Sequence, residues 1–236
     1  MRFLRVVLAV MILTAGVVIG QGSAAGEQFA VTWQVRISNL TPPGPGAPGS
    51  QPMSPPVFAV HRHGVHVWQV GHVASHAVAA VAEDANTGIL ASALSKQRGV
   101  TEAVASPGGP IPSGQSATYT LRVPPGHLVS IVTMLVNTND AFTGVDALWL
   151  PGRNLTVRSI AYDAGSEVNN ERRTDIPGPC CNNPFVREPE GDVIRPHEGI
   201  VGRGDLSRDV YGWPEPVVEI TFSRADRPTF SSVVRW

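Results

Sequence analysis

The clearest pattern in the chain is an alternation of large apolar side chains with smaller or polar ones near its start. Between residues 29 and 37, every second position is large and apolar: Phe29, Val31, Trp33, Val35 and Ile37. A period of two predicts a β-strand with one buried face. Further extended segments are predicted at 55–60, 118–123, 128–136, 146–150, 155–162 and 217–222. Many short strands between Gly- and Pro-containing turns predict an all-β fold, a sandwich or a barrel.

Two short helices and two loops interrupt this pattern. Ser75 is a predicted N-cap for a helix over 76–83, and a second helix is expected from Thr87 through Leu94. Residues 42–49 are dominated by Pro and Gly and predict a surface loop. Residues 175–216 show little periodicity, and we expect a long ordered loop packed on one end of the fold. The five tryptophans mostly fall in predicted strands and are expected in the core.

The first 25 residues have the three-part order of a secretory signal. Arg2 and Arg5 are followed by an almost wholly apolar run over 6–19 and then by the small residues of 22–25. The apolar run is shorter than the roughly 20 residues that a membrane-spanning helix needs. We therefore expect cleavage near Ala24 or Ala25 and a secreted protein, extracellular or periplasmic, with no strong anchor afterwards. Residues 26–236 then form one domain with an extended, loop-rich C-terminal part.

Charge and cysteine content narrow the possible partners. Charged residues make up 16% of the chain, against about 25% in typical proteins, and the net charge is −1. This balance offers no overall basic field for nucleic acid or for an anionic membrane. Cys180 and Cys181 are adjacent, so they cannot join distant segments. They could bond to each other, pair between chains or stay reduced, and an unusual turn is the favoured interpretation.

The densest group of polar residues follows the predicted strand at 128–136. Residues 137–146 are rich in Asn, Asp and Thr and predict a loop, and a later predicted strand runs into Asp163 and Glu167. Calcium takes six to eight oxygen ligands from carboxylates, carbonyls and water. Asp140, Asp163 and Glu167 could supply such ligands if the two segments meet at one end of a sandwich. The alternative from the residues alone is that Asn, Asp and Gly simply make turns.

Residues 31–167 resemble the spondin N-terminal domain of F-spondin, mindin and many bacterial exported proteins. The resemblance rests on six landmarks in order: Ser38-Asn39-Leu40-Thr41, Ser54-Pro55-Pro56-Val57-Phe58, Val70-Gly71 with Ala74-Ser75, Ala82-Glu83-Asp84, Thr133-Met134-Leu135-Val136-Asn137-Thr138-Asn139-Asp140 and Asp163-Ala164-Gly165. It implies an antiparallel β-sandwich, C2-like in shape, with short helices and long loops. It also implies a divalent metal at one edge, with Asp140, Asp163 and Glu167 at the ligand positions.

The chain departs from the animal members of this family at one metal position and directly after another. The third acidic residue is Glu167 where those members have Asp, so its side chain is one methylene longer. The Trp that follows their first Asp is absent, and Ala141 and Phe142 stand there instead. Asp146 is a further acidic residue that could be either a fourth ligand or part of a surface turn.

Two other signals compete with calcium binding. His61, His63 and His66 suggest zinc, but a strand places His61 and His63 on one face only, and solvated loop histidines are favoured. Arg203-Gly204-Asp205 matches a tripeptide recognised by integrins, although so short a motif often occurs by chance. No nucleophile elbow, Walker loop or HExxH is present in the sequence.

These signals lead to one expected function and two alternatives. We expect a secreted, calcium-binding module for adhesion or extracellular ligand binding, and not an enzyme. One alternative is a hydrolase of cell-envelope glycans that uses Asp140 and Asp163 as an acid–base pair. The other is a purely structural exoprotein.

Overall fold

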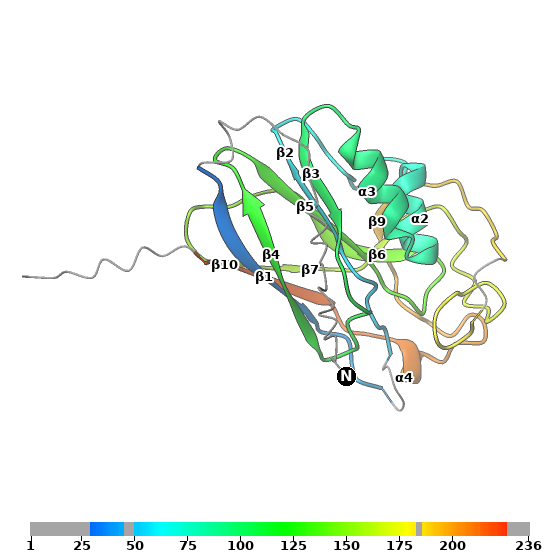
Figure 1. The fold of residues 1–236 in the computed structure, drawn as a ribbon. Coiled ribbons are helices and arrows are strands. Elements are labelled where there is room, and N and C mark those ends of the chain that lie inside the picture. The colour runs from blue at the N-terminus through cyan, green and yellow to red at the C-terminus, as the bar shows by residue number, and fades with distance from the viewer. Residues whose placement is uncertain (1–28, 45–49, 183–185, 226–236) are drawn as a thin grey trace, which may run out of the picture.

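The computed structural model describes residues 29–44, 50–182 and 186–225. Within them, ten strands form two antiparallel sheets that pack face to face (Figure 1). The four-stranded sheet has the order β4 (Ser116–Val123), β1 (Val31–Asn39), β10 (Val218–Arg224) and β7 (Leu155–Ser159). The six-stranded sheet has the order β3 (Val100–Ala105), β2 (Val57–His61), β5 (Leu128–Met134), β6 (Ala141–Trp149), β8 (Tyr162–Asp163) and β9 (Arg195–Pro196). The predicted antiparallel β-sandwich with short helices and long loops is confirmed.

Apolar side chains fill the space between the two sheets. The alternation noted near the start of the chain places Trp33, Val35 and Ile37 of β1 in this core, where none is more than 2% exposed. Their partners in β10, Ile220 and Phe222, lie in the same core and are equally buried. The outward positions of β1 are polar, so one face of the four-stranded sheet meets solvent.

A second core lies on the outer face of the six-stranded sheet, under α2 (His76–Asp84) and α3 (Thr87–Ser95) (Figure 1). Val78 and Leu90 of these helices pack with Phe142 of the sheet. The predicted cap is confirmed, because the Ser75 hydroxyl accepts a hydrogen bond from the Val78 amide at 3.2 Å. Because β6 is covered on both faces at its start, its sequence there shows no alternation.

This double burial explains an error in the sequence interpretation. The polar run over 137–146 predicts a loop, but β6 begins at Ala141 and only residues 137–140 form the turn before it. Strand β3 is not predicted at all, because it is an edge strand with weak alternation. Nor do the tryptophans mostly lie in strands: Trp68 and Trp213 lie outside them, and Trp149, at the end of β6, is 58% exposed. Trp236 is outside the described residues.

The described residues between β8 and β10, 164–182 and 186–217, pack at one end of the sandwich as expected (Figure 1). This segment contains α4 (Arg208–Tyr211) and a small core of its own around Ile176, Ile200 and Leu206. Cys180 and Cys181 are bonded to each other in a turn of this segment, so the adjacent-pair alternative is the one that the structure shows. In the described ranges, no helix has the length and apolar character needed to cross a bilayer. The predicted signal peptide lies outside them.

Candidate metal centre

The turn between β5 and β6 brings Asp140 and Asp163 to the same sheet end. Asp140 directly precedes β6, and the first residue of β6, Ala141, pairs in register with Asp163 of β8. Thr138 shapes the turn, because its hydroxyl donates to the Leu135 carbonyl at 2.6 Å and accepts from the Ala141 amide at 3.0 Å. The backbone of neighbouring antiparallel strands therefore positions both carboxylates.

Asp140 is completely buried, and its two carboxylate oxygens differ in their surroundings. Oδ2 accepts hydrogen bonds from the Ser166 amide at 2.8 Å, the Ser166 hydroxyl at 3.1 Å and the Glu167 amide at 3.0 Å. Oδ1 is buried and has no hydrogen-bond partner among the described residues. Leaving a buried oxygen without a partner costs free energy, and a bound ion or an ordered water molecule can remove that cost.

Glu167 lies beside Asp140 and is 1% exposed. The Arg187 Nε lies 2.5 Å from its Oε1 in an ion pair. The Arg187 guanidinium also contacts Asp84, and its Nε lies 3.9 Å from Glu83. Asp140 Oδ1 therefore has no polar partner among the described residues. Glu167, in contrast, has the Arg187 guanidinium beside Oε1 and a hydrogen bond from the Asn139 side chain that lowers its pKa.

Burial raises the pKa of Asp140 to about 7, and the nearby charge of Asp163 acts in the same direction. Burial also raises the pKa of Glu167 to about 9, with further contributions from the charges of Glu83, Asp140 and Asp175. The Arg187 guanidinium favours the ionised form of Glu167. Burial and the charges of Glu83, Asp140 and Asp175 favour the protonated form, and their combined effect on the pKa is larger. Both acids are therefore expected to hold protons more tightly than usual until a cation compensates their charges.

Asp163, in contrast, already has its partners. Oδ1 accepts from the Gly165 amide at 2.7 Å, and Oδ2 accepts from the Asn169 side chain at 2.6 Å. The Arg195 Nη2 lies 2.8 Å from Oδ2. Burial raises the pKa of Asp163 while Arg195 lowers it. The structure thus brings all three predicted residues to one end, where Asp140 Oδ1 has no partner among the described residues and the Glu167 carboxylate contacts one cation there, Arg187.

The chemistry of these oxygens fits a hard cation such as calcium better than zinc, which prefers nitrogen and sulfur ligands. In the described part of the chain, no group of three His, Cys, Asp or Glu side chains stands ready to hold a metal. Two carboxylates would therefore need backbone carbonyls, the Asn139 side chain or water to complete a calcium shell. Asp140 and Glu167 are therefore the two residues best placed to bind calcium. Asp163 could bind it only by giving up its ion pair with Arg195.

Comparison with known families bears directly on this end of the sandwich. The model of the spondin N-terminal domain, Spondin_N, matches residues 48–168, more than half of the chain. The chain belongs to the spondin N-terminal domain family. The matched range includes Asp140, Asp163 and Glu167 and ends before Arg187 and Arg195. We found no curated protein that matches the chain.

Of the three histidines considered for zinc, His63 and His66 are exposed in the loop after β2 as expected, and His61 is not. His61 is fully buried at the end of β2, with its Nε2 2.8 Å from the Ser130 hydroxyl, so the loop interpretation is wrong for this residue. The Ser130 hydroxyl donates to Asp146 Oδ1 at 2.8 Å, and His66 Nδ1 lies 2.6 Å from Asp146 Oδ2. Asp146 therefore belongs to this network, about 20 Å along β6 from Asp140.

The Arg203-Gly204-Asp205 tripeptide has internal partners at each position. Arg203 pairs with Glu198, and Asp205 Oδ2 accepts from the Arg173 amide at 3.0 Å. A side chain at Gly204 would come within 2.4 Å of the Asn170 carbonyl oxygen. These contacts account for the three residue types through packing within the spondin domain.

The sequence patterns do not predict Arg187, Arg195 and Asn169, which surround the acidic residues. All three lie beyond the two acidic motifs, in sequence without periodicity. Arg195 is also part of a polar cavity of about 410 Å³ next to the candidate metal centre, whose lining comprises Val168, Asn169, Asn170, Arg172, Glu190, Arg195, Glu198, Arg203 and Gly204. The cavity adjoins Asp163 through Arg195 and Asn169, but neither Asp140 nor Asp163 lines it.

Proposed function

We propose that this spondin domain binds calcium between the 135–140 turn and the segment after β8, and acts outside the cell as a non-catalytic adhesion or ligand-binding module. The Oδ1 of the buried Asp140, which is unpartnered among the described residues and next to the buried carboxylate of Glu167, carries this proposal. A bound calcium ion supplies positive charge that lets both carboxylates ionise. Asp140 Oδ2 already fastens the second segment through the amides of Ser166 and Glu167. Asp163 holds Arg195 and the turn at Gly165.

The burial of the acidic pair also supports a role without catalysis. An acid–base pair needs a raised pKa and access to a substrate. Asp140 has the first, with a pKa raised to about 7, but no part of its side chain reaches solvent. The polar cavity beside Asp163 is the better place for an extracellular ligand, because it lies within the size range of small-molecule sites. Glycan hydrolysis that persists in EDTA and is lost in Asp140→Asn would contradict this proposal.

Calcium titration of the mature protein tests the metal centre. We expect measurable heat of binding and a higher melting temperature, with about 2.7 kcal/mol of stabilisation when free calcium is about 100 times the dissociation constant. Asp140→Asn should lose most of both effects, because it removes one of the two ionisable ligands. Asp209→Asn, the same chemical change at an exposed position of α4, should keep them. Absence of heat and of a thermal shift in the wild type would rule out calcium.

Replacing Arg187 separates its role from that of the metal. Arg187→Gln removes the cation paired with Glu167 Oε1, so calcium should bind several-fold more tightly. Without calcium, the same variant should be less stable, because Glu83, Asp84 and Glu167 lose a shared counter-charge. Arg158→Gln provides the control, since it removes the same charge from an exposed ion pair with Glu219 on the four-stranded sheet. Unchanged calcium affinity in Arg187→Gln would place the ion away from Glu167.

The purely structural alternative makes a different prediction for Asp163. If the loops only form turns, calcium should not change the stability of the wild type or of Asp163→Asn. Asp163→Asn should lower the stability in EDTA in either case, because Arg195 and the Gly165 amide lose a charged partner. If the proposed site is right, the same variant should still respond to calcium, since Asp140 and Glu167 remain.

A further inference from the structure

The spondin domain separates its charges between its two ends, which the net charge of −1 conceals. The registers bring the ends of β1, β4 and β10 together, and likewise those of β2, β5 and β6. The short 124–127 and 150–154 connections join the two sheets at this same end. Six basic residues lie there, and we call them the basic end: Arg62, Lys96, Arg98, Arg122, Arg153 and Arg224.

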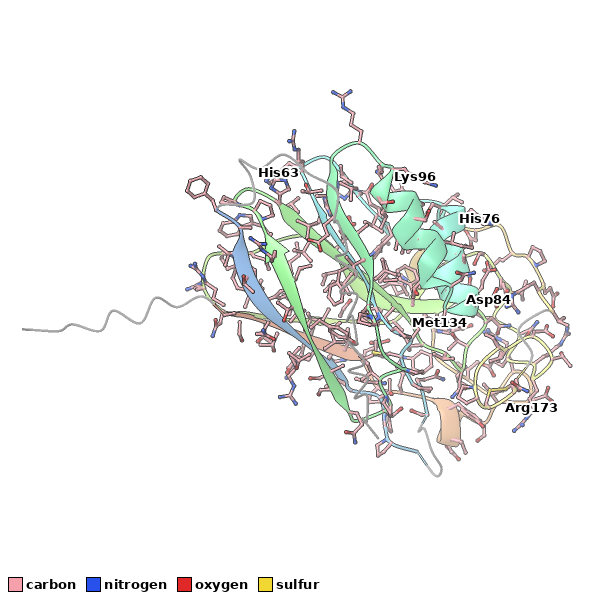
Figure 2. The ribbon with its side chains drawn as sticks, in the orientation of Figure 1. His63, His76, Asp84, Lys96, Met134 and Arg173 are labelled. Atoms are coloured by element: carbon pink, nitrogen blue, oxygen red, sulfur yellow. A yellow bond between two sulfur atoms is a disulfide. The ribbon has the colours of Figure 1, made fainter. Side chains whose placement is uncertain are left out.

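Few acidic residues oppose this basic end. Glu102 of β3 and Asp146 of β6 are the nearest described ones along their strands. Glu102 faces Arg122, while the Asp146 carboxylate is occupied by Ser130, His66 and backbone amides. Asp140 and its acidic neighbours lie beyond the other end of β6. In Figure 2, His63 and Lys96 lie toward one end of the domain, and Asp84 and Arg173 lie toward the other.

An exposed tryptophan stands at the same end. Trp149, the last residue of β6, is 58% exposed and pairs in register with the buried Leu128 at the start of β5. Phe29, just before β1, is 68% exposed. Large exposed aromatic side chains beside arginine and lysine are typical of proteins that rest on a lipid surface, where the ring enters the headgroup region.

We propose that the basic end docks the spondin domain onto a bilayer that contains anionic lipid headgroups. Arginine and lysine side chains pair with the headgroup phosphates, and Trp149 inserts at the interface. The side chains of Lys96, Arg98 and Arg153 are exposed, and none of them makes an ion pair within the described ranges. This orientation directs the acidic end and the polar cavity away from the membrane, where a ligand can reach them.

Sedimentation with vesicles tests the docking, and EDTA keeps calcium from bridging the acidic end to lipid. We expect the wild type to bind vesicles of phosphatidylcholine mixed with phosphatidylglycerol, and not phosphatidylcholine alone, with affinity falling as salt rises. The triple variant Lys96→Glu, Arg98→Glu and Arg153→Glu should bind at least about tenfold more weakly. Its control is Arg36→Glu, Arg173→Glu and Arg208→Glu, which changes net charge equally but lies elsewhere, and should bind within about twofold of wild type.

Trp149→Ser distinguishes lipid from other anionic partners. The wild type should show a blue shift of tryptophan fluorescence on binding, and Trp149→Ser should lose most of that shift and bind several-fold more weakly. Val73→Ser, at another highly exposed apolar position, should behave as wild type. Thermal unfolding of each variant confirms that it is folded.

Three results would overturn the proposal: no vesicle binding in EDTA, equal weakening by both triple variants, or retention on dextran sulfate without vesicle binding. The last would assign the basic end to a soluble polyanion. Loss of calcium binding in Asp140→Asn leaves the vesicle result unchanged, so the two proposals fail separately.

Discussion

Gly144→Ala is expected to destabilise the spondin domain by about 4 kcal/mol or more, at the severe end of single substitutions. Gly144 lies in β6 with φ of 149°, and a Cβ there would stand 1.8 Å from the Ile131 carbonyl oxygen and 2.7 Å from the Ile131 carbonyl carbon. Both are backbone atoms of β5, so a change of side-chain rotamer cannot relieve the clash. Relief requires the two central strands of the six-stranded sheet to separate.

The loss should appear as a melting temperature lower by about 8–16 °C, or as failure to accumulate folded protein. Gly152→Ala is the matched control, because Gly152 also has a positive φ, of 66°, but a Cβ there would meet no atom within 4 Å. Gly152→Ala should destabilise the domain by only about 1 kcal/mol, which is the strain of placing alanine at a positive φ. Equal stability of the two variants would contradict the close approach of β5 and β6 at Gly144.

The same double burial of β6 limits what the sequence can predict. Strand β1 is predicted correctly because one of its faces is polar, so the alternation is visible. The start of β6 has Ala141 between the sheets and Phe142 under the helices, and a strand buried on both faces loses its periodicity. In the sequence, Gly144 therefore looks like a turn residue, although in the structure it allows β6 to approach the backbone of β5 closely.

The candidate site can be predicted only as far as its local motifs reach. Asp140, Asp163 and Glu167 lie next to strand ends, and antiparallel pairing of β6 with β8 brings them together as expected. The sequence does not predict that Arg187 pairs with Glu167 or that Arg195 pairs with Asp163. Both arginines come from a long segment whose position depends on tertiary contacts around Ile176 and Leu206. Sequence spacing indicates which groups gather, but it does not show which oxygens keep a free lone pair.

Net charge is misleading in a similar way. A value of −1 for the whole chain predicts no attraction to an anionic surface. Folding nevertheless gathers Arg62, Arg98 and Arg153 from three separate connections at one end. Electrostatic attraction acts over a Debye length of about 8–10 Å, so the charge near a surface matters more than the total. Only the topology reveals that local charge.

The stability of the spondin domain is expected to respond to pH in opposite directions with and without calcium. In EDTA, Asp140 and Glu167 have folded-state pKa values of about 7 and about 9, both above their values in the unfolded chain. Between about pH 5 and 9 the folded state therefore holds more protons than the unfolded state, and stability falls as pH rises. The slope can reach about 1.4 kcal/mol per pH unit for each such group, and the ion pair with Arg187 reduces it.

Saturating calcium should flatten or reverse this slope, because the ion binds the ionised carboxylates and binding then releases protons. Thermal unfolding across this pH range, in EDTA and in calcium at matched ionic strength, measures both slopes. The double variant Asp140→Asn with Glu167→Gln should be nearly insensitive to calcium and should lose most of the decline in EDTA. A wild type whose stability rises with pH in EDTA would mean that Arg187 already compensates Glu167 fully. In that case the buried pair would be a completed ion-pair network, and calcium would have no charge left to neutralise there.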